Sequence, residues 1–229
     1  MFNYDNLLYQ KINKNMDVSY WLLITHTFSL FPITVFLWTY KRRKTPESIY
    51  MLIKFIYCVS FSLLYHTYHV EDMTSEFQTM DTWLFLDKYT SSCLIFTTIM
   101  YCLRVRPPQF YITISGIETG FLMFIVLENI HTVHLMTWMI ILSTIVVSVL
   151  KWRTLYRYVQ MFYYNSFLVV LFSILSTVYF FLAMESKYTF HHSLWHCFVF
   201  ISAGLGGMLK YKLDEIVHPI SRRETLESI

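Results

Sequence analysis

The sequence predicts an all-α, polytopic membrane protein: a seven-transmembrane-helix bundle with its N-terminus outside and its C-terminus in the cytosol. Of the 229 residues, 55% are hydrophobic and only 14% are charged. Soluble domains carry about 25% charged residues, so this composition is typical of a membrane protein. The four cysteines all lie within apolar runs, which gives no indication of a disulfide framework.

Seven stretches are long and apolar enough to span a bilayer, which takes about 20 mostly apolar residues per helix. In order they are 19–39, 49–69, 82–103, 109–127, 130–150, 161–184 and 189–209. Residues 19–209 would form the transmembrane domain, with an extracellular tail at 1–18 and a cytosolic tail at 210–229. Only Glu128-Asn129 separates the fourth stretch from the fifth, so the number of spans and the orientation both depend on that break.

Basic residues predict the orientation of the bundle. They gather in alternate connections, whereas the remaining connections carry mainly acidic residues. The positive-inside rule places the basic connections in the cytosol, and hence the N-terminus outside. The basic residues are Lys41, Arg42, Arg43, Lys44, Arg104, Arg106, Lys151, Arg153, Arg157, Lys210, Lys212, Arg222 and Arg223.

One acidic residue, Glu118, falls in the middle of the fourth span, between Gly116 and Gly120. An ionisable residue inside a membrane helix indicates a function by default. The structural alternative is a carboxylate bonded to a neighbouring helix, near Lys54. The two glycines form a small-xxx-small face suited to close helix packing, and the last span repeats such small residues at Gly204, Gly206 and Gly207.

Two histidines one helical turn apart, His192 and His196, open the last span. Their spacing points both rings to the same side, as a shared metal ion requires. In the predicted topology, Ser62 and His66 near the end of the second span lie at the same depth, and so does Asp87 near the start of the third. Three imidazoles with an open fourth position suit zinc, so the metal ligands would be His66, His192 and His196.

Such a zinc ion would lower the pKa of a bound water to about 7. Asp87 would take the proton of that water or orient a ligand histidine, and Ser62 would donate a hydrogen bond to a histidine or an oxyanion. Two alternatives remain open. Paired histidines can also ligate haem. Histidines near helix ends can simply sit at the interface with a wet polar edge, as expected for His26, His69, His131, His134 and His218.

Three motifs together resemble the signature of the CREST superfamily of seven-helix membrane proteins. They are Ser62-xxx-His66, the segment from Asp81 to Asp87, and His192-xxx-His196. Within that superfamily the chain looks most like the transmembrane-protein-eight and myomaker family, which Phe31-Pro32 ahead of Lys41-Arg42-Arg43 also resembles. The resemblance implies the seven-helix bundle with an external N-terminus and zinc on the three histidines named above.

The resemblance leads to fusion as the first predicted function, with lipid hydrolysis as the alternative. A short chain without an extracellular domain favours a myomaker-like role in cell–cell (myoblast) fusion at the plasma membrane, with a second fusion protein or a homo-oligomer as partner. The intact set of Ser62, Asp87 and three histidines favours a zinc-dependent hydrolase of membrane lipids, at the plasma membrane or in the Golgi and other endomembranes. The zinc would be structural, or catalytic toward an unidentified lipid, in the first case and catalytic in the second. Nucleic acid is not expected as a partner in either case.

Overall fold

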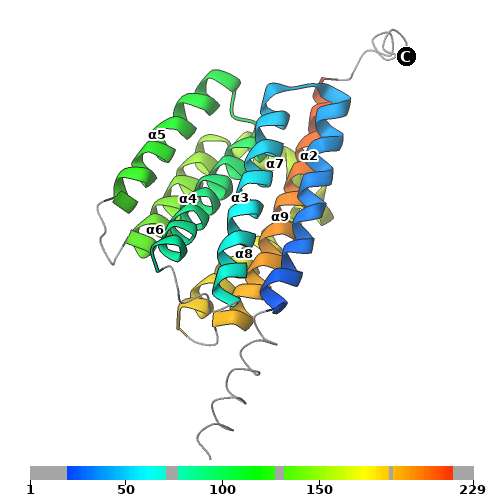
Figure 1. Cartoon of the computed structure of the whole chain (residues 1–229). Coiled ribbons are helices and arrows are strands. Elements are labelled where there is room, and N and C mark those ends of the chain that lie inside the picture. Colours follow the sequence, from blue (N-terminus) through cyan, green and yellow to red (C-terminus); the bar gives the residue numbers. More distant parts are fainter. Residues whose placement is uncertain (1–19, 71–76, 127–131, 186–187, 219–229) are drawn as a thin grey trace, which may run out of the picture.

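The computed structural model describes residues 20–70, 77–126, 132–185 and 188–218. Every element within these ranges is helical, and the helices run side by side as a bundle (Figure 1). Four helices in the described ranges are long and apolar enough to cross a membrane, and a bent pair makes a fifth candidate. The prediction of a helical membrane protein is therefore confirmed.

The first helix extends from Tyr20 to Arg43 and includes a tighter turn, η1 (His26–Ser29), before α2 (Leu30–Arg43). Pro32 lacks the N–H that would bond to the carbonyl of Phe28, so the regular α-helical pattern is interrupted beside this turn. The remaining helices are α3 (Pro46–Val70), α4 (Phe77–Cys102), α5 (Pro107–Val126), α6 (Thr132–Leu150), α7 (Trp152–Met161), α8 (Tyr163–Glu185) and α9 (Tyr188–Val217).

Each predicted span corresponds to a helix, but the spans differ in how well they qualify for crossing a membrane. The four that qualify alone are Tyr20–Arg43, Pro46–Thr67, Tyr163–Ala183 and Thr189–Val217. The last helix continues to Val217, past the predicted end at 209. The tail at 1–18 and the break at Glu128-Asn129 lie outside the described residues.

The short helix α7 corrects the sequence prediction, which treated this basic stretch as a connection. Trp138–Leu150 and Trp152–Met161 are bent by 77° relative to each other. A search for apolar stretches of about 20 residues does not find a ten-residue helix that mixes arginine with aromatic side chains. The chain therefore turns from α6 into a crosswise helix before α8 begins.

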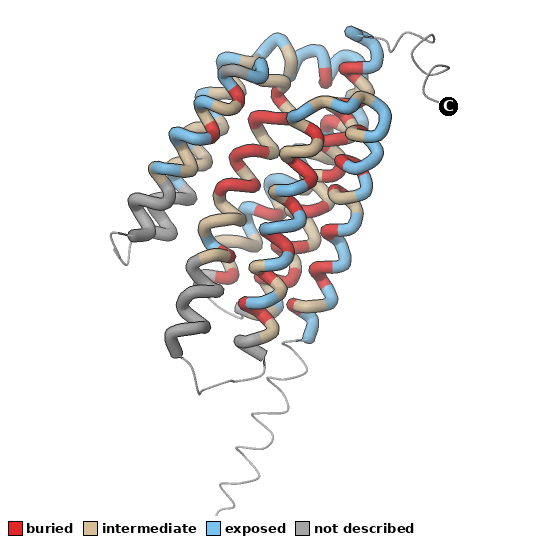
Figure 2. The backbone as a smooth tube through the Cα atoms, turned by 45° about the horizontal axis from the view of Figure 1, so that its top comes forward, coloured by how far each residue is buried: buried red, intermediate tan, exposed pale blue. Residues whose placement is uncertain are grey.

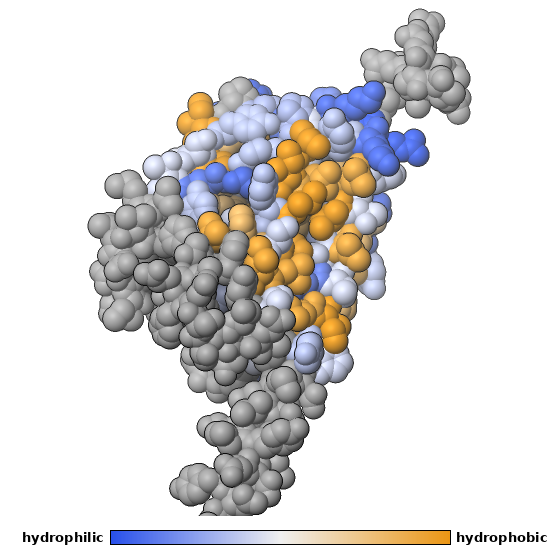
Figure 3. Space-filling model, in the orientation of Figure 1, coloured by the Kyte–Doolittle hydropathy of each residue, from blue (hydrophilic) through white to orange (hydrophobic). Residues whose placement is uncertain are grey.

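The apolar core lies among α2, α3, α4, α5 and α9, and its largest fully buried side chains are aromatic. Figure 2 shows buried positions on the facing sides of the central helices and exposed positions on the outside. On the periphery, only 11% of the most apolar stretch of α8 is buried. Figure 3 shows apolar side chains over α2 and α3 and hydrophilic ones where α2 ends. The core aromatics include Phe36, Phe55, Phe96, Tyr101 and Phe110.

Glycines on α9 allow the first helix to approach closely. A Cβ at Gly204 would collide with the ring of Phe31, and one at Gly207 would lie 3.2 Å from the ring of Phe36. By contrast, a Cβ at Gly116 or Gly120 would meet no atom within 4 Å in the described chain. Close packing is thus confirmed for the α9 glycines, and the same expectation for the α5 glycines is wrong within the described bundle.

Two groups of charged residues tie helices together. Lys54 on α3 forms an ion pair with Glu118 on α5, as the structural alternative for that carboxylate predicts. Arg104 and Lys210 bind the two carboxylate oxygens of Asp214 at 2.7 and 2.6 Å. Each charge in these groups is partly shielded from solvent and paired, as burial of charge requires.

We predict that Gly204→Val destabilises the protein more than Gly116→Val does. Both changes place the same β-branched residue in a helix, so their intrinsic helix propensities cancel. Overpacking against Phe31 should cost about 1–3 kcal/mol and lower the Tm by several degrees. Thermal unfolding of each purified variant, monitored by size-exclusion chromatography, measures the difference in Tm. An equal loss for both variants would contradict the packing described here.

Candidate metal centre

Three histidines from three helices meet inside the bundle. They are His26 in η1, His66 on α3 and His196 on α9, and the nitrogens available for a metal ion all lie within 4.8 Å of one another. Their side chains are almost completely buried, with 3%, 0% and 2% of their surface exposed. Since histidine is costly in an apolar membrane interior, three of them in mutual contact indicate a functional site.

The spacing of His66 and His196 suits a tetrahedral metal ion. Their Nε2 atoms lie 3.3 Å apart. Zinc–nitrogen bonds of about 2.0–2.1 Å at tetrahedral angles separate two ligand nitrogens by roughly 3.3–3.4 Å. The two rings are nearly perpendicular, at 87°. The pair is therefore already at the distance that a shared ion imposes.

The hydrogen bonds of His26 determine which of its nitrogens is available. Its Nδ1 lies 2.6 Å from the carbonyl oxygen of Leu22, which can only accept, so Nδ1 carries the proton and donates it. In the neutral ring, Nε2 then has the free lone pair, and it faces the hydroxyl of Ser62 at 2.9 Å. A backbone carbonyl on one nitrogen commonly orients the other toward a metal.

One ring nitrogen of His196, Nδ1, is buried and has no hydrogen-bond partner among the described residues. Buried polar atoms are normally bonded. This nitrogen is not the one that faces His66, which is Nε2, so it does not itself mark the converging site. Imidazole donors suit zinc, copper, iron and nickel, so the residues fit a transition-metal ion without selecting zinc.

Ser62 connects the histidines to Asp87. The Ser62 hydroxyl lies close enough to the Asp87 carboxylate to interact with it, and this carboxylate accepts a hydrogen bond from Ser91 at 3.3 Å. The same hydroxyl faces Nε2 of His26, and a single hydroxyl proton serves only one acceptor at a time. Both Ser62 and Asp87 are buried. The structure thus brings both predicted catalytic residues beside the histidines.

His192 lies next to the cluster but outside the group whose nitrogens all converge. Its ring centroid is 5.2 Å from that of His66 and 4.7 Å from that of His196. Its side chain is buried. Two of the three predicted ligands, His66 and His196, therefore share the converging group, and the third packs directly against both.

The prediction for His26 is wrong: the residue is buried within the cluster rather than wet at an interface. A signal was available, because the predicted topology puts His26 near the outer start of the first span, at the depth of the other histidines. His218 is exposed, as expected for an interfacial residue. The side chains of His69, His131 and His134 lie outside the described set.

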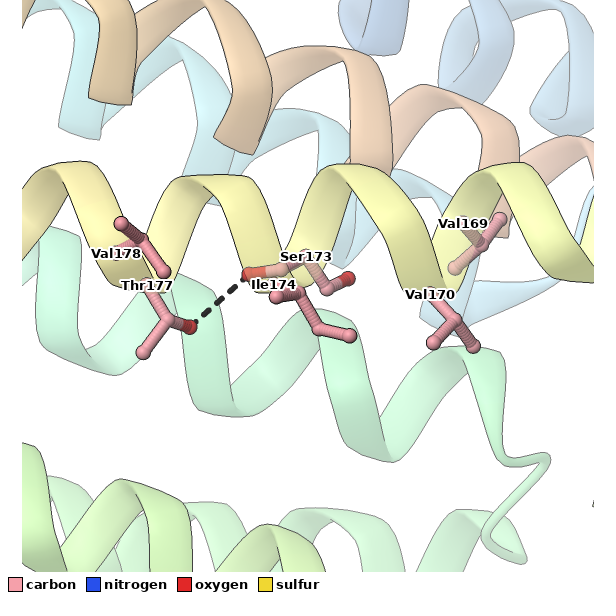
Figure 4. Close-up of a pocket in the computed structure, with 6 residues that line it drawn as sticks. All are labelled: Val169, Val170, Ser173, Ile174, Thr177 and Val178. Atoms are coloured by element: carbon pink, nitrogen blue, oxygen red, sulfur yellow. Dashed lines mark hydrogen bonds between the residues drawn. The ribbon is translucent and has the colours of Figure 1, made fainter.

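A separate apolar groove runs along α8, away from the histidines. Figure 4 shows its lining, which comes entirely from one helix. Within it, the Thr177 hydroxyl donates a hydrogen bond to the Ser173 carbonyl. None of the proposed site residues lines this groove. The lining residues are Val169, Val170, Ser173, Ile174, Thr177 and Val178.

Comparison of the chain with protein-family models gives no match, and comparison with curated proteins gives none either. The chemistry of the site therefore rests on the residues themselves.

We predict that wild-type protein purified in detergent holds about one transition-metal ion per chain. His66→Ala and His196→Ala should abolish binding because they remove two converging ligands. His26→Ala and His192→Ala should each weaken it, by roughly ten-fold or more. Metal analysis of the purified chains measures the stoichiometry.

His191→Ala is the matched control, because His191 neighbours His192 but packs against Tyr179, away from the cluster. It should retain the metal. Folded wild-type protein that takes up no metal would refute the site, and so would an equal loss in the His191→Ala control.

Proposed function

We propose that this chain is a seven-span membrane protein of the transmembrane-protein-eight and myomaker type, with its N-terminus outside, that hydrolyses an ester or amide bond of a membrane lipid at a zinc site. The observation that carries the proposal is the buried cluster of His26, His66 and His196 beside Ser62 and Asp87. His66 and His196 would hold the ion, with His26 or His192 completing its protein ligands.

Zinc, when bound, supplies a Lewis acid that makes water nucleophilic near neutral pH. The chain's own residues then have distinct tasks. Asp87 accepts a proton as general base, because its carboxylate lies one hydroxyl away from the histidines. Ser62 fixes that carboxylate when it donates to Asp87, or donates to a developing oxyanion. Leu22 keeps His26 in the tautomer that presents Nε2.

The surroundings of the site support a lipid substrate. The cluster lies between helices that qualify as membrane spans, and the outward faces of those helices carry large exposed apolar residues. A polar bond reaching this depth would belong to a molecule with apolar chains, whose partition into the bilayer delivers it to the site. Lipid amides, lipid esters and glycolipid anchors all meet this description.

The second candidate is cell–cell fusion at the plasma membrane, which the resemblance of the three sequence motifs to the myomaker family favours. In that case the ion would hold η1, α3 and α9 together without chemistry, and the chain would act with a second fusion protein or with another copy of itself. Asp87 and Ser62 would then serve only as hydrogen-bond partners within the cluster.

We predict that Asp87→Asn lowers lipid hydrolysis by about 10²–10⁴-fold while zinc content stays near wild type, because loss of a general base removes the proton acceptor and leaves the imidazoles in place. Ser62→Ala should lower it at least ten-fold. Mass spectrometry of lipids released by the zinc-loaded protein provides the measurement.

Ser60→Ala is the control for Ser62→Ala, because Ser60 lies on the same helix but is exposed and bonds to the carbonyl of Ile56. Its activity should equal that of wild type. A zinc-loaded protein that cleaves no lipid amide, lipid ester or glycolipid anchor would refute the hydrolase.

The fusion candidate predicts that fibroblasts expressing the chain form multinucleate hybrids when mixed with muscle precursor cells. Under this candidate Asp87→Asn should fuse as well as wild type, whereas His66→Ala should fail because the bundle loses its cross-link. Surface labelling confirms that each variant reaches the plasma membrane. Absence of hybrids with wild-type protein at the surface would exclude this role.

A further inference from the structure

Helix α7 has three distinct faces. Trp152, Leu155, Tyr156 and Val159 fall on one apolar face of the helix, and all four are exposed. The adjoining face carries Arg153, Arg157 and Gln160, which are also exposed. The third face is buried and holds Tyr158. A helix with neighbouring apolar and cationic faces is typical of segments that lie in a membrane surface.

The buried face fixes α7 to the bundle. The hydroxyl of Tyr158 donates to the carbonyl of Cys102 at the end of α4, at 2.6 Å, and the Ser166 hydroxyl donates to the Tyr158 carbonyl at 3.0 Å. The Tyr158 ring packs against Leu209 and Leu213 of α9. These contacts leave the apolar and cationic faces pointing away from the protein.

The neighbouring helices set α7 across one end of the bundle. It is bent by 77° from α6, so it lies across the direction in which α6 traverses the bundle. Leu150 before it and Tyr163 after it are both exposed, which continues the apolar surface of α6 and α8 onto α7. Figure 1 places α7 toward the end of the bundle where α2 terminates, the end that carries Lys41 and Arg42.

We propose that α7 lies in the bilayer interface and binds anionic lipid head groups. The face with Trp152 enters the boundary between head groups and acyl chains, and Arg153 and Arg157 contact the anionic groups above it. Charge complementarity selects the lipid, because each arginine near an anionic bilayer surface adds to the attraction. A re-entrant position is disfavoured because it would carry both arginines into the hydrocarbon.

The experiment uses the full chain reconstituted in phosphatidylcholine bilayers that contain phosphatidylserine. The fluorescence of Trp152 alone is obtained by subtracting the tryptophan fluorescence of the Trp152→Phe variant from that of wild type. Quenching by phosphatidylserine brominated on its acyl chains is compared with quenching by equally brominated phosphatidylcholine. We expect roughly a ten-fold preference for phosphatidylserine, reduced by high salt because interfacial charges are screened.

The double variant Arg153→Gln/Arg157→Gln should lose this preference. The control Lys41→Gln/Arg42→Gln removes the same charge from exposed residues at the same end of the bundle and should keep it. All four residues are exposed, so neither double variant should alter the fold, and size-exclusion chromatography checks this. An equal loss in both double variants, or equal quenching by both lipids in wild type, would overturn the proposal.

The depth of quenching separates the remaining outcomes. Bromines close to the head group should quench Trp152 more than bromines near the chain ends. Stronger quenching by the deep bromines would mean that α7 is re-entrant and would overturn the proposal. Quenching by neither lipid would mean that this face contacts water, another protein or a second copy of the chain, and would overturn it as well.

Discussion

The close approach of α9 to the first helix is the constraint on which the candidate site depends. Gly204 and Gly207 leave room for the rings of Phe31 and Phe36, so these rings pack directly against the backbone of α9. His26 lies five residues before Phe31, about 7 Å along the first helix. His196 lies eight residues before Gly204, about 12 Å along α9. A bulkier residue at either glycine would separate the helices and, one or two turns away, the imidazoles. Packing in one part of the bundle thus sets the distances between ligands in another.

The other charged groups between the helices are paired with opposite charges, because an unpaired charge is costly in an apolar bundle. The pair of Lys54 and Glu118 joins α3 to α5, and the Tyr50 hydroxyl also reaches Glu118. Asp214 joins the end of α4 to α9 through Arg104. In each case opposite charges satisfy one another within the chain, and deleting one partner would leave the other exposed to an apolar environment. The histidine cluster differs, because its members are three identical side chains that cannot pair as opposite charges. Their converging nitrogens are instead arranged to bind a cation.

The helices and two of the three clustered histidines could be predicted from sequence because they depend on long, regular signals. A run of about 20 apolar residues has few structural options, and the depth of each residue follows from the direction of its span. That reasoning brought His66 and His196 together. It missed His26 because a lone histidine without an i+4 partner resembles an interfacial residue, and because nothing in the periodicity marks the turn that Pro32 follows. It missed α7 because a helix of ten residues with two arginines is too short and too polar to be recognised as a membrane span. Both omissions are short irregularities within long regular elements.

The choice of the third protein ligand connects the geometry to the two proposed functions. His26 presents Nε2 from one side, held by Leu22, while His192 packs against His66 and His196 from the turn before. A tetrahedral zinc ion takes four ligands. If both His26 and His192 bind, the protein fills every position, and the site is closed and structural, as the fusion candidate requires. If one of them does not bind the ion directly, a position remains open for water beside Ser62 and Asp87, as hydrolysis requires. Because Ser62 competes for the same Nε2 lone pair of His26, a Ser62–His26 hydrogen bond keeps that histidine from the ion and favours the open site.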